Sequence, residues 1–141
     1  MELVDKLKKI IQGEVHDDEK TLARYSHDAS LFEIRPKVVV FPNDTEDLKS
    51  LVKFVKEERS KGNREVYLTP RSGGTDMTGG PLGESIIVDF TKHFTGIGSI
   101  ESRPHFTEGF AGLALVEPGV FYRDFEKETL KYNLILPPFP A

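Results

Sequence analysis

Hydrophobic positions in the first part of the chain predict short helices next to a buried strand. Apolar residues recur at helical spacing over residues 2–12, which predicts an amphipathic helix that ends at Gly13. A polar link at 16–19 follows, and the pair Leu22 and Tyr25 then indicates a short helix covering a sheet edge. Residues 38–41 read Val-Val-Val-Phe, a continuous run that is typical of a strand buried on both faces of a parallel sheet.

The pattern continues as a βαβ unit. Residues 43–45 follow a strand-ending proline and offer an N-cap for a helix. This helix has one apolar stripe and is expected to end at Gly62. Residues 66–69 predict the next strand. A strand, a helix and a strand of these lengths predict a parallel pair with a right-handed crossover.

The second part of the chain is less regular. Strands are predicted at 86–89 and 113–116, and a helix with aromatic residues on its core face is predicted at 121–132. Residues 94–112 fit either a strand with a hairpin or an irregular loop. The chain ends on an apolar strand-like stretch, 134–136, and a proline-rich turn. Because free termini are usually polar, we expect the sequence to be part of a longer protein.

Composition narrows the function classes. The 141 residues are 38% hydrophobic and 30% charged, which excludes a membrane span and argues against general disorder. The net charge of −4 is unfavourable for binding nucleic acid. The absence of cysteine excludes a disulfide scaffold, a cysteine zinc site and a catalytic thiol, and it fits a cytoplasmic protein. The first residues do not read as a signal peptide.

A glycine-rich segment at 70–81 is the main candidate for chemistry. It reads Pro-Arg-Ser-Gly-Gly-Thr-Asp-Met-Thr-Gly-Gly-Pro, with four glycines in eight positions. Glycine permits a positive φ and close approach of a ligand, and successive backbone N–H groups can form a nest for a phosphate or pyrophosphate. Thr75 and Thr78 could add hydroxyl donors. Arg71 could add charge or pair with an acidic residue.

The better-known phosphate motifs do not match this segment. Gly74 and Gly79 have the spacing of a P-loop, but Gly80 and Pro81 replace its Lys-Ser/Thr pair. The Gly-x-Gly-x-x-Gly fingerprint of dinucleotide-binding folds is also absent. The segment therefore binds a phosphate-like group by another design or is only a tight turn.

Other candidate groups carry weaker signals. The four histidines, at 16, 27, 93 and 105, show no metal-ligand spacing, so we assign no metal site. Ser72 lacks the strand-to-helix elbow of a hydrolase nucleophile. We assign no catalytic residue.

The order of motifs resembles a known family. The chain reads Pro-Lys-Val-Val-Val-Phe-Pro at 36–42, Leu-Thr-Pro-Arg-Ser-Gly-Gly-Thr at 68–75, Ile-Val-Asp-Phe at 87–90, Val-Glu-Pro-Gly-Val at 116–120 and Leu-Pro-Pro-Phe-Pro-Ala at 136–141. This series, over about residues 17–141, resembles the N-terminal half of the FAD-binding domain of the FAD-linked oxidases. That superfamily is typified by vanillyl-alcohol oxidase and p-cresol methylhydroxylase. The D-lactate dehydrogenase and glycolate oxidase branch is the nearest in pattern.

The resemblance implies an α+β fold made of two small α/β subdomains with FAD between them. Residues 1–90 would form the first, βαβ-containing subdomain with the glycine loop. Residues 91–141 would begin the second subdomain, which is incomplete in a truncated chain.

The resemblance also implies the site. Backbone amides along 71–76 would hold the pyrophosphate, two later glycines would close the loop, and a Pro-Pro pair would run beside the flavin or form only a rigid turn. The predicted cofactor-binding residues are Arg71, Ser72, Gly73, Gly74, Thr75, Asp76, Gly79, Gly80, Pro137 and Pro138. A related branch with covalent flavin has histidine where this chain has Thr75, so we expect non-covalent FAD.

The implied activity is the oxidation of a 2-hydroxy acid such as D-lactate or glycolate, with an electron acceptor that the sequence does not identify. We expect the 141 residues alone to be inactive. The alternatives are a non-catalytic nucleotide-binding or interaction module, and a UDP-sugar reductase of the related fold. The expected location is the cytoplasm, or the periphery of the inner membrane for a longer protein. A homodimer is one way to cover an exposed FAD site.

Overall fold

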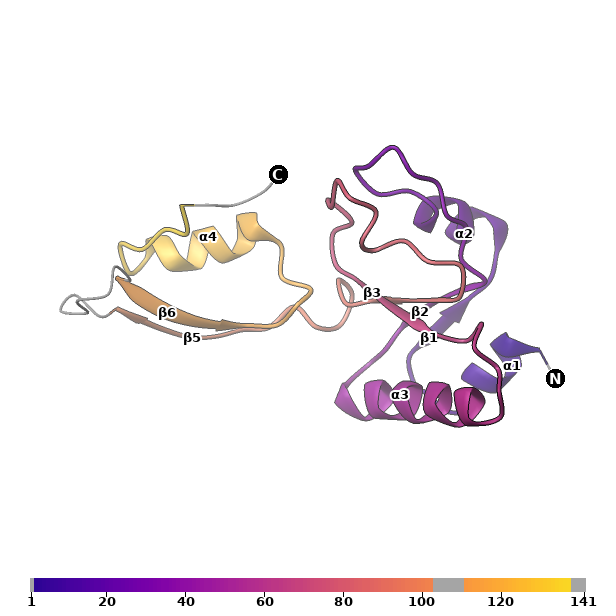
Figure 1. The fold of residues 1–141 in the computed structure, drawn as a ribbon. Helices are drawn as coiled ribbons and strands as arrows, with labels where there is room; N and C mark the ends of the chain where they lie inside the picture. The colour runs from indigo at the N-terminus through magenta and orange to yellow at the C-terminus, as the bar shows by residue number, and fades with distance from the viewer. Residues whose placement is uncertain (1, 103–110, 138–141) are drawn as a thin grey trace.

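The computed structural model describes residues 2–102 and 111–137 (Figure 1). Its elements are, in chain order, α1 (Leu3–Leu7), β1 (Glu14–His16), α2 (Glu19–Tyr25), β2 (Val38–Phe41), α3 (Thr45–Ser60), β3 (Leu68–Arg71), β4 (Ile86–Asp89), β5 (Ile97–Ser102), β6 (Gly112–Val116) and α4 (Tyr122–Leu130). Within these residues, no helix is both long and apolar enough to cross a bilayer.

The first sheet has four strands in the order β1-β2-β4-β3. β4 runs parallel to both of its neighbours, with Ile87 opposite Val39 of β2 and opposite Thr69 of β3. β1 pairs antiparallel with β2 at the edge. The carboxyl ends of β2, β3 and β4 therefore meet at one edge of the sheet, and the segments that follow them lie close together.

Helices cover both faces of this sheet (Figure 1). On one face, α1 and α3 pack against Val38, Val40, Ile86 and Val88. On the opposite face, α2 packs against the alternate positions of the same strands. The three valines of β2 are fully buried, which confirms the prediction of a strand with two covered faces. The glycine-rich segment lies on the α2 side (Figure 1).

Capping residues fix the ends of the helices as the sequence predicts. The Asp44 carboxylate accepts hydrogen bonds from the backbone N–H groups of residues 46 and 47 at the start of α3. Asp18 caps α2 in the same way through the N–H of Thr21. Gly62 takes a φ of +89° just after α3, a conformation that glycine adopts without steric cost.

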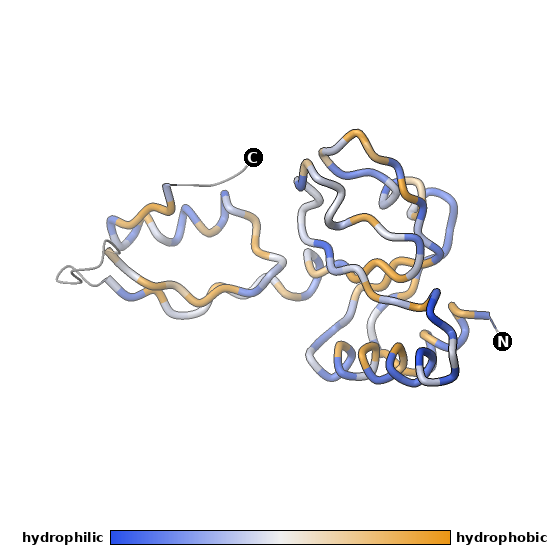
Figure 2. Tube along the Cα trace, viewed as in Figure 1, coloured by the Kyte–Doolittle hydropathy of each residue, from blue (hydrophilic) through white to orange (hydrophobic). Residues whose placement is uncertain are grey.

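The second sheet is a two-stranded antiparallel pair, β5 and β6, beside α4. Figure 2 shows apolar residues along both strands. Several large side chains here are exposed, among them Leu113, Leu115 and Leu130. Phe125 is only partly buried and Phe121 is 53% exposed. The prediction that the aromatic residues of this helix lie in the core is therefore wrong for the described residues. The two-stranded sheet does not provide enough surface to cover this helix.

Some element boundaries differ from the predictions. α1 ends at Leu7, well before the expected residue 12, and β3 is shifted two residues towards the carboxyl end. The sequence did not predict β1, which lies between Gly13 and the expected polar link and shares only His16 with that link. Residues 134–136 form no strand. In the stretch 94–112, for which the sequence allowed a strand or a loop, residues 97–102 form strand β5. The expected hairpin or loop at 103–112 falls mostly outside the described residues.

The content of mixed helices and strands confirms the α+β class. The first sheet ends at Asp89 and the second begins at Ile97, on either side of the expected division at residue 90. The limits of the two subdomains stay a prediction.

Candidate functional site

The glycine loop, residues 72–81, begins at the carboxyl end of β3 and is largely exposed. Gly74 and Gly79 adopt φ values of +68° and +84°, which side-chain-bearing residues rarely take. The backbone N–H groups of Gly73, Gly74 and Thr75 donate no hydrogen bond to any residue in the described part of the chain. Consecutive free donors on an exposed loop can form an anion site.

The carboxylate of Asp76 closes the loop on itself. It accepts hydrogen bonds from the backbone N–H and the hydroxyl of Thr78, the latter at 2.6 Å. The hydroxyl and N–H of Thr78 lower the pKa of this carboxyl, with a further contribution from the N–H of Gly80. Asp76 is therefore an ionised structural acceptor, and its negative charge faces the second half of the loop.

The segment between α2 and β2 forms an outer wall for the glycine loop. The N–H of Ala29 donates to the carbonyl oxygen of Asp76 at 3.1 Å. A Cβ added to Gly79 would lie 2.9 Å from the ring of Phe32, so glycine allows this close approach. The wall and the loop thus pack directly on each other.

Arg71 lies behind the loop. Its Nη2 donates to the carbonyl oxygen of His27 at 2.8 Å, and its Cζ sits 5.0 Å from the centre of the Tyr25 ring. A Cβ on Gly74 would lie 2.7 Å from Cζ, which places the guanidinium directly against that glycine. Burial lowers the pKa of Arg71, and nearby acidic groups oppose the shift.

Tyr25 connects this arginine to the sheet. Its hydroxyl donates to Oδ2 of the buried Asp89 at 2.8 Å, and burial followed by this hydrogen bond raises the pKa of the phenol. Asp89 also accepts from the N–H and hydroxyl of Thr91. Among the described residues, two buried side-chain atoms have no hydrogen-bond partner: Nη1 of Arg71 and Oδ2 of Asp28.

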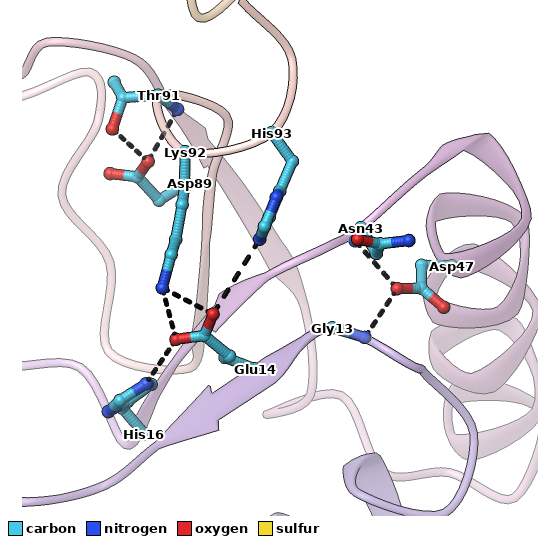
Figure 3. A network of polar contacts seen from close by, with 9 residues as sticks. All are labelled: Gly13, Glu14, His16, Asn43, Asp47, Asp89, Thr91, Lys92 and His93. Carbon is cyan, nitrogen blue, oxygen red and sulfur yellow. Dashed lines mark hydrogen bonds and ion pairs between the residues drawn. The ribbon is translucent and has the colours of Figure 1, made fainter.

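A second polar cluster lies at the same edge of the sheet (Figure 3). Glu14 is bonded to Lys92 and His16, with His93 3.8 Å away. The Lys92 hydrogen bond, followed by the His16 hydrogen bond, lowers the pKa of Glu14. The cluster borders a surface pocket of about 370 Å³ that also touches Tyr25. Its charges neutralise one another, so it presents no net anion site.

Eight of the ten predicted site residues come together in the loop or at its start: Arg71, Ser72, Gly73, Gly74, Thr75, Asp76, Gly79 and Gly80. Pro137 lies after α4 and is exposed, and Pro138 lies outside the described residues. A Cβ at Gly73 would come 3.4 Å from the ring of Phe121, so the start of α4 approaches the loop.

Sequence reasoning missed the residues behind and beside the loop: Tyr25, His27, Ala29, Phe32 and Asp89. The first four lie 39 to 46 positions before Arg71, and Asp89 lies 18 positions after it. No local spacing in the sequence could therefore identify them as neighbours of the loop. Among the described histidine, aspartate and glutamate residues, no group of three is arranged to hold a metal ion.

The arrangement can hold a diphosphate. The free N–H groups supply donors without side chains, and the open Cα atoms of the glycines let the ligand approach the backbone. The Arg71 guanidinium lies directly against Gly74 and forms no ion pair at contact distance in the described residues, although Asp89 and Asp28 act on its charge from further away. Both features fit the pyrophosphate of a dinucleotide.

Comparison with known proteins agrees with this geometry. The family model described as the FAD binding domain matches residues 36–141. The D-2-hydroxyglutarate dehydrogenase of Pseudomonas putida is 31% identical over 118 residues, which cover 79% of this chain and 11% of that protein. The D-lactate dehydrogenase of Anaerostipes hadrus is 25% identical over 144 residues, covering 99% of this chain and 27% of that protein. The chain thus spans only about a tenth to a quarter of these relatives.

Solved structures show the same fold. The structure of p-cresol methylhydroxylase with substrate bound superposes with a TM-score of 0.68 over 93% of this chain and 24% of that one, at 21% identity. This likeness confirms the expected fold class. The match of the family model to most of the chain confirms the expected cofactor class, FAD. The chain belongs to the FAD-binding domains of the FAD-linked oxidoreductases.

Proposed function

We propose that the glycine loop binds the pyrophosphate of FAD through its backbone, and that the chain is the FAD-binding part of a flavin-dependent dehydrogenase. The observation that carries the proposal is the row of free N–H groups at Gly73, Gly74 and Thr75, exposed at the carboxyl end of β3. Family membership supplies the identity of the ligand.

The residues of the chain then have separate tasks. Gly73, Gly74 and Thr75 donate to the pyrophosphate, while Asp76 holds the loop closed through Thr78. Phe121 lies against Gly73 and excludes water from one side of the loop. When bound, the flavin supplies the redox chemistry, and the protein supplies binding and orientation. The 141 residues alone bind without turnover in this proposal.

The proposed substrate is a 2-hydroxy acid. Two similar proteins are named as dehydrogenases of such acids, D-2-hydroxyglutarate and D-lactate. The test is anaerobic addition of D-2-hydroxyglutarate, D-lactate or glycolate to the flavin-loaded protein that carries this domain. Loss of the oxidised flavin absorbance with one of them supports the proposal, and reduction by none of them contradicts it.

FAD binding is tested by calorimetric titration of the chain with FAD, ADP and FMN. Because the loop would hold the pyrophosphate, we expect FAD and ADP to bind and FMN to bind much more weakly. FMN binding as tight as that of FAD, or no FAD binding at all, would count against the loop as the site.

A matched pair of glycines sharpens this test. Gly74 and Gly62 both have positive φ, but a Cβ at Gly74 meets the Arg71 guanidinium, whereas a Cβ at Gly62 meets nothing within 4 Å. We expect Gly74→Val to abolish FAD binding and Gly62→Val to retain it at a similar backbone strain. Ser72→Ala should have little effect because the proposed donors are backbone groups. Equal affinity in the two glycine variants would refute the assignment.

A further inference from the structure

Arg71 is the positively charged residue that immediately precedes the glycine loop, yet the polar contacts of its guanidinium lie behind the loop. Nη2 is bonded to the carbonyl oxygen of His27, Cζ faces the ring of Tyr25, and the group fills the space beside the Cα atom of Gly74. The planar guanidinium thus touches the outer wall, helix α2 and the loop at once.

The ring of Tyr25 packs against this guanidinium. The tyrosine is 7% exposed, and its hydroxyl is anchored on Asp89 at the carboxyl end of the central strand. β3 and β4 are further tied at this point, since the N–H of Phe90 donates to the carbonyl oxygen of Arg71 at 3.0 Å. The chain of contacts therefore runs from the rigid centre of the sheet, through Tyr25 and Arg71, to Gly74.

We propose that Tyr25 and Arg71 form an internal support that holds the glycine loop in its FAD-binding shape, so that Arg71 is a positioning residue that acts through the loop and does not contact the pyrophosphate. This inference rests on the proposed function of the loop. It separates two roles that a positive residue beside a phosphate site can have: a direct charge partner, or a part of the scaffold.

The two roles predict different behaviour of conservative variants. A direct charge partner tolerates lysine, since an ammonium group also binds phosphate as a point charge. A planar group that stacks on an aromatic ring and fills a gap does not tolerate lysine, whose geometry is different. In the scaffold role, removing the ring of Tyr25 has the same effect as removing the guanidinium, because both belong to one support.

The experiment compares Arg71→Lys, Arg71→Gln, Tyr25→Leu and the double variant Arg71→Lys/Tyr25→Leu with the wild-type chain. Arg24→Gln is the matched control, because Arg24 lies 5.9 Å from the centre of the same ring but is exposed and forms no hydrogen bond with the glycine loop in the described residues. Leu51→Ala, in the core on the opposite face of the sheet, controls for lost stability alone.

The first readout is hydrogen exchange in the chain without FAD. We expect the amide of Ala29, which donates to Asp76, to exchange about tenfold faster in each of the Arg71 and Tyr25 variants, since local opening there becomes easier. Arg24→Gln should leave this rate unchanged. Unchanged exchange in Arg71→Lys and Tyr25→Leu would overturn the proposal, whether or not FAD binds.

The second readout is FAD affinity, measured at a temperature at which every variant is folded. We expect Arg71→Lys, Arg71→Gln and Tyr25→Leu each to weaken binding about tenfold, and the double variant no further, because residues in one contact network are not additive. Full affinity in Arg71→Lys with loss in Arg71→Gln would show a direct charge contact and overturn the proposal, as would effects that multiply in the double variant. If the wild-type chain bound no FAD, the proposed function would fail. The hydrogen-exchange measurement would still test whether Tyr25 and Arg71 support the loop.

Discussion

At the scale of single residues, the proposed site would hold its ligand through backbone N–H groups of the glycine loop. The glycine positions could be predicted, because four glycines in eight residues need a conformational reason, and two of them do take positive φ. The place of Arg71 could not be predicted. Its guanidinium meets His27 and Tyr25, more than 40 positions earlier, and such contacts arise only when the sheet has formed.

Thr75 carries a prediction about the attachment of the flavin. A threonine hydroxyl has no imidazole nitrogen with which to bond the flavin, so FAD bound at this loop is expected to be released when the protein is denatured. After precipitation of the FAD-loaded protein with trichloroacetic acid, the yellow colour should be in the supernatant. Flavin that stays in the pellet after washing would contradict non-covalent binding.

At the scale of elements, apolar runs predicted the buried strands and the exposed strand β6, but they did not predict β1. β2 and β4 read as continuous apolar runs, and they form the centre of the sheet. β1 has the sequence Glu-Val-His and is only partly buried, so its pairing with β2 leaves no pattern in the sequence. Gly13 leads into β1, and glycine is needed there because a Cβ would overlap the backbone of residue 41.

Asp47 ties three of these elements together and makes their stability depend on pH. Its buried carboxylate accepts 2.8 Å hydrogen bonds from the N–H groups of Gln12, Gly13 and Asn43, two of which Figure 3 shows. Burial alone would raise the pKa of Asp47, but these three donors outweigh it and the pKa is lowered. The carboxylate therefore stabilises the fold fully above pH ~4, the ordinary pKa, and this contribution is lost as the pH falls through the lower folded-state value.

Asp47→Asn tests this contribution. We expect it to lower the free energy of unfolding by about 3 kcal/mol at pH 7, since a buried charged acceptor of several N–H groups is lost. Urea unfolding at pH 7 and near pH 2 measures the effect, and the difference from wild type should shrink at the acid pH. Asp17→Asn, an exposed carboxylate, is the control and should change little at either pH. A deficit of equal size at both pH values would contradict the role of the charge.

At the scale of the whole molecule, the two sheets differ in how well they are covered. The first has helices on both faces, whereas the second leaves Leu113, Leu115 and Val116 of β6 exposed. The sequence predicted the α+β class only through its resemblance to the FAD-linked oxidases, because the alternating elements by themselves predicted a βαβ unit. It could not predict the exposure of β6, since an apolar strand reads the same whether or not a partner covers it.

Exposed apolar surface of this kind predicts self-association of the 141-residue chain. Sedimentation velocity over a range of concentrations should show a monomer–dimer equilibrium, and Leu115→Lys should shift it towards monomer by removing a side chain that is 70% exposed. Val52→Lys, at an exposed apolar position on α3, should leave it unchanged. A monomer at every concentration, or equal effects of the two variants, would contradict an interface on β6.

The strand order has a consequence for how the site is assembled. β2 and β3 precede β4 in the chain, yet β4 lies between them, so the first two strands have no direct partner in each other. The glycine loop leaves β3 at its carboxyl end, and the chain then enters β4 at the opposite edge of the sheet, where Ile86 pairs with Leu68. The contacts behind the loop, from Tyr25 to Asp89 and from the N–H of Phe90 to the carbonyl oxygen of Arg71, require β4 to be in place. We therefore expect the sheet and the proposed nucleotide site to form in one cooperative folding event.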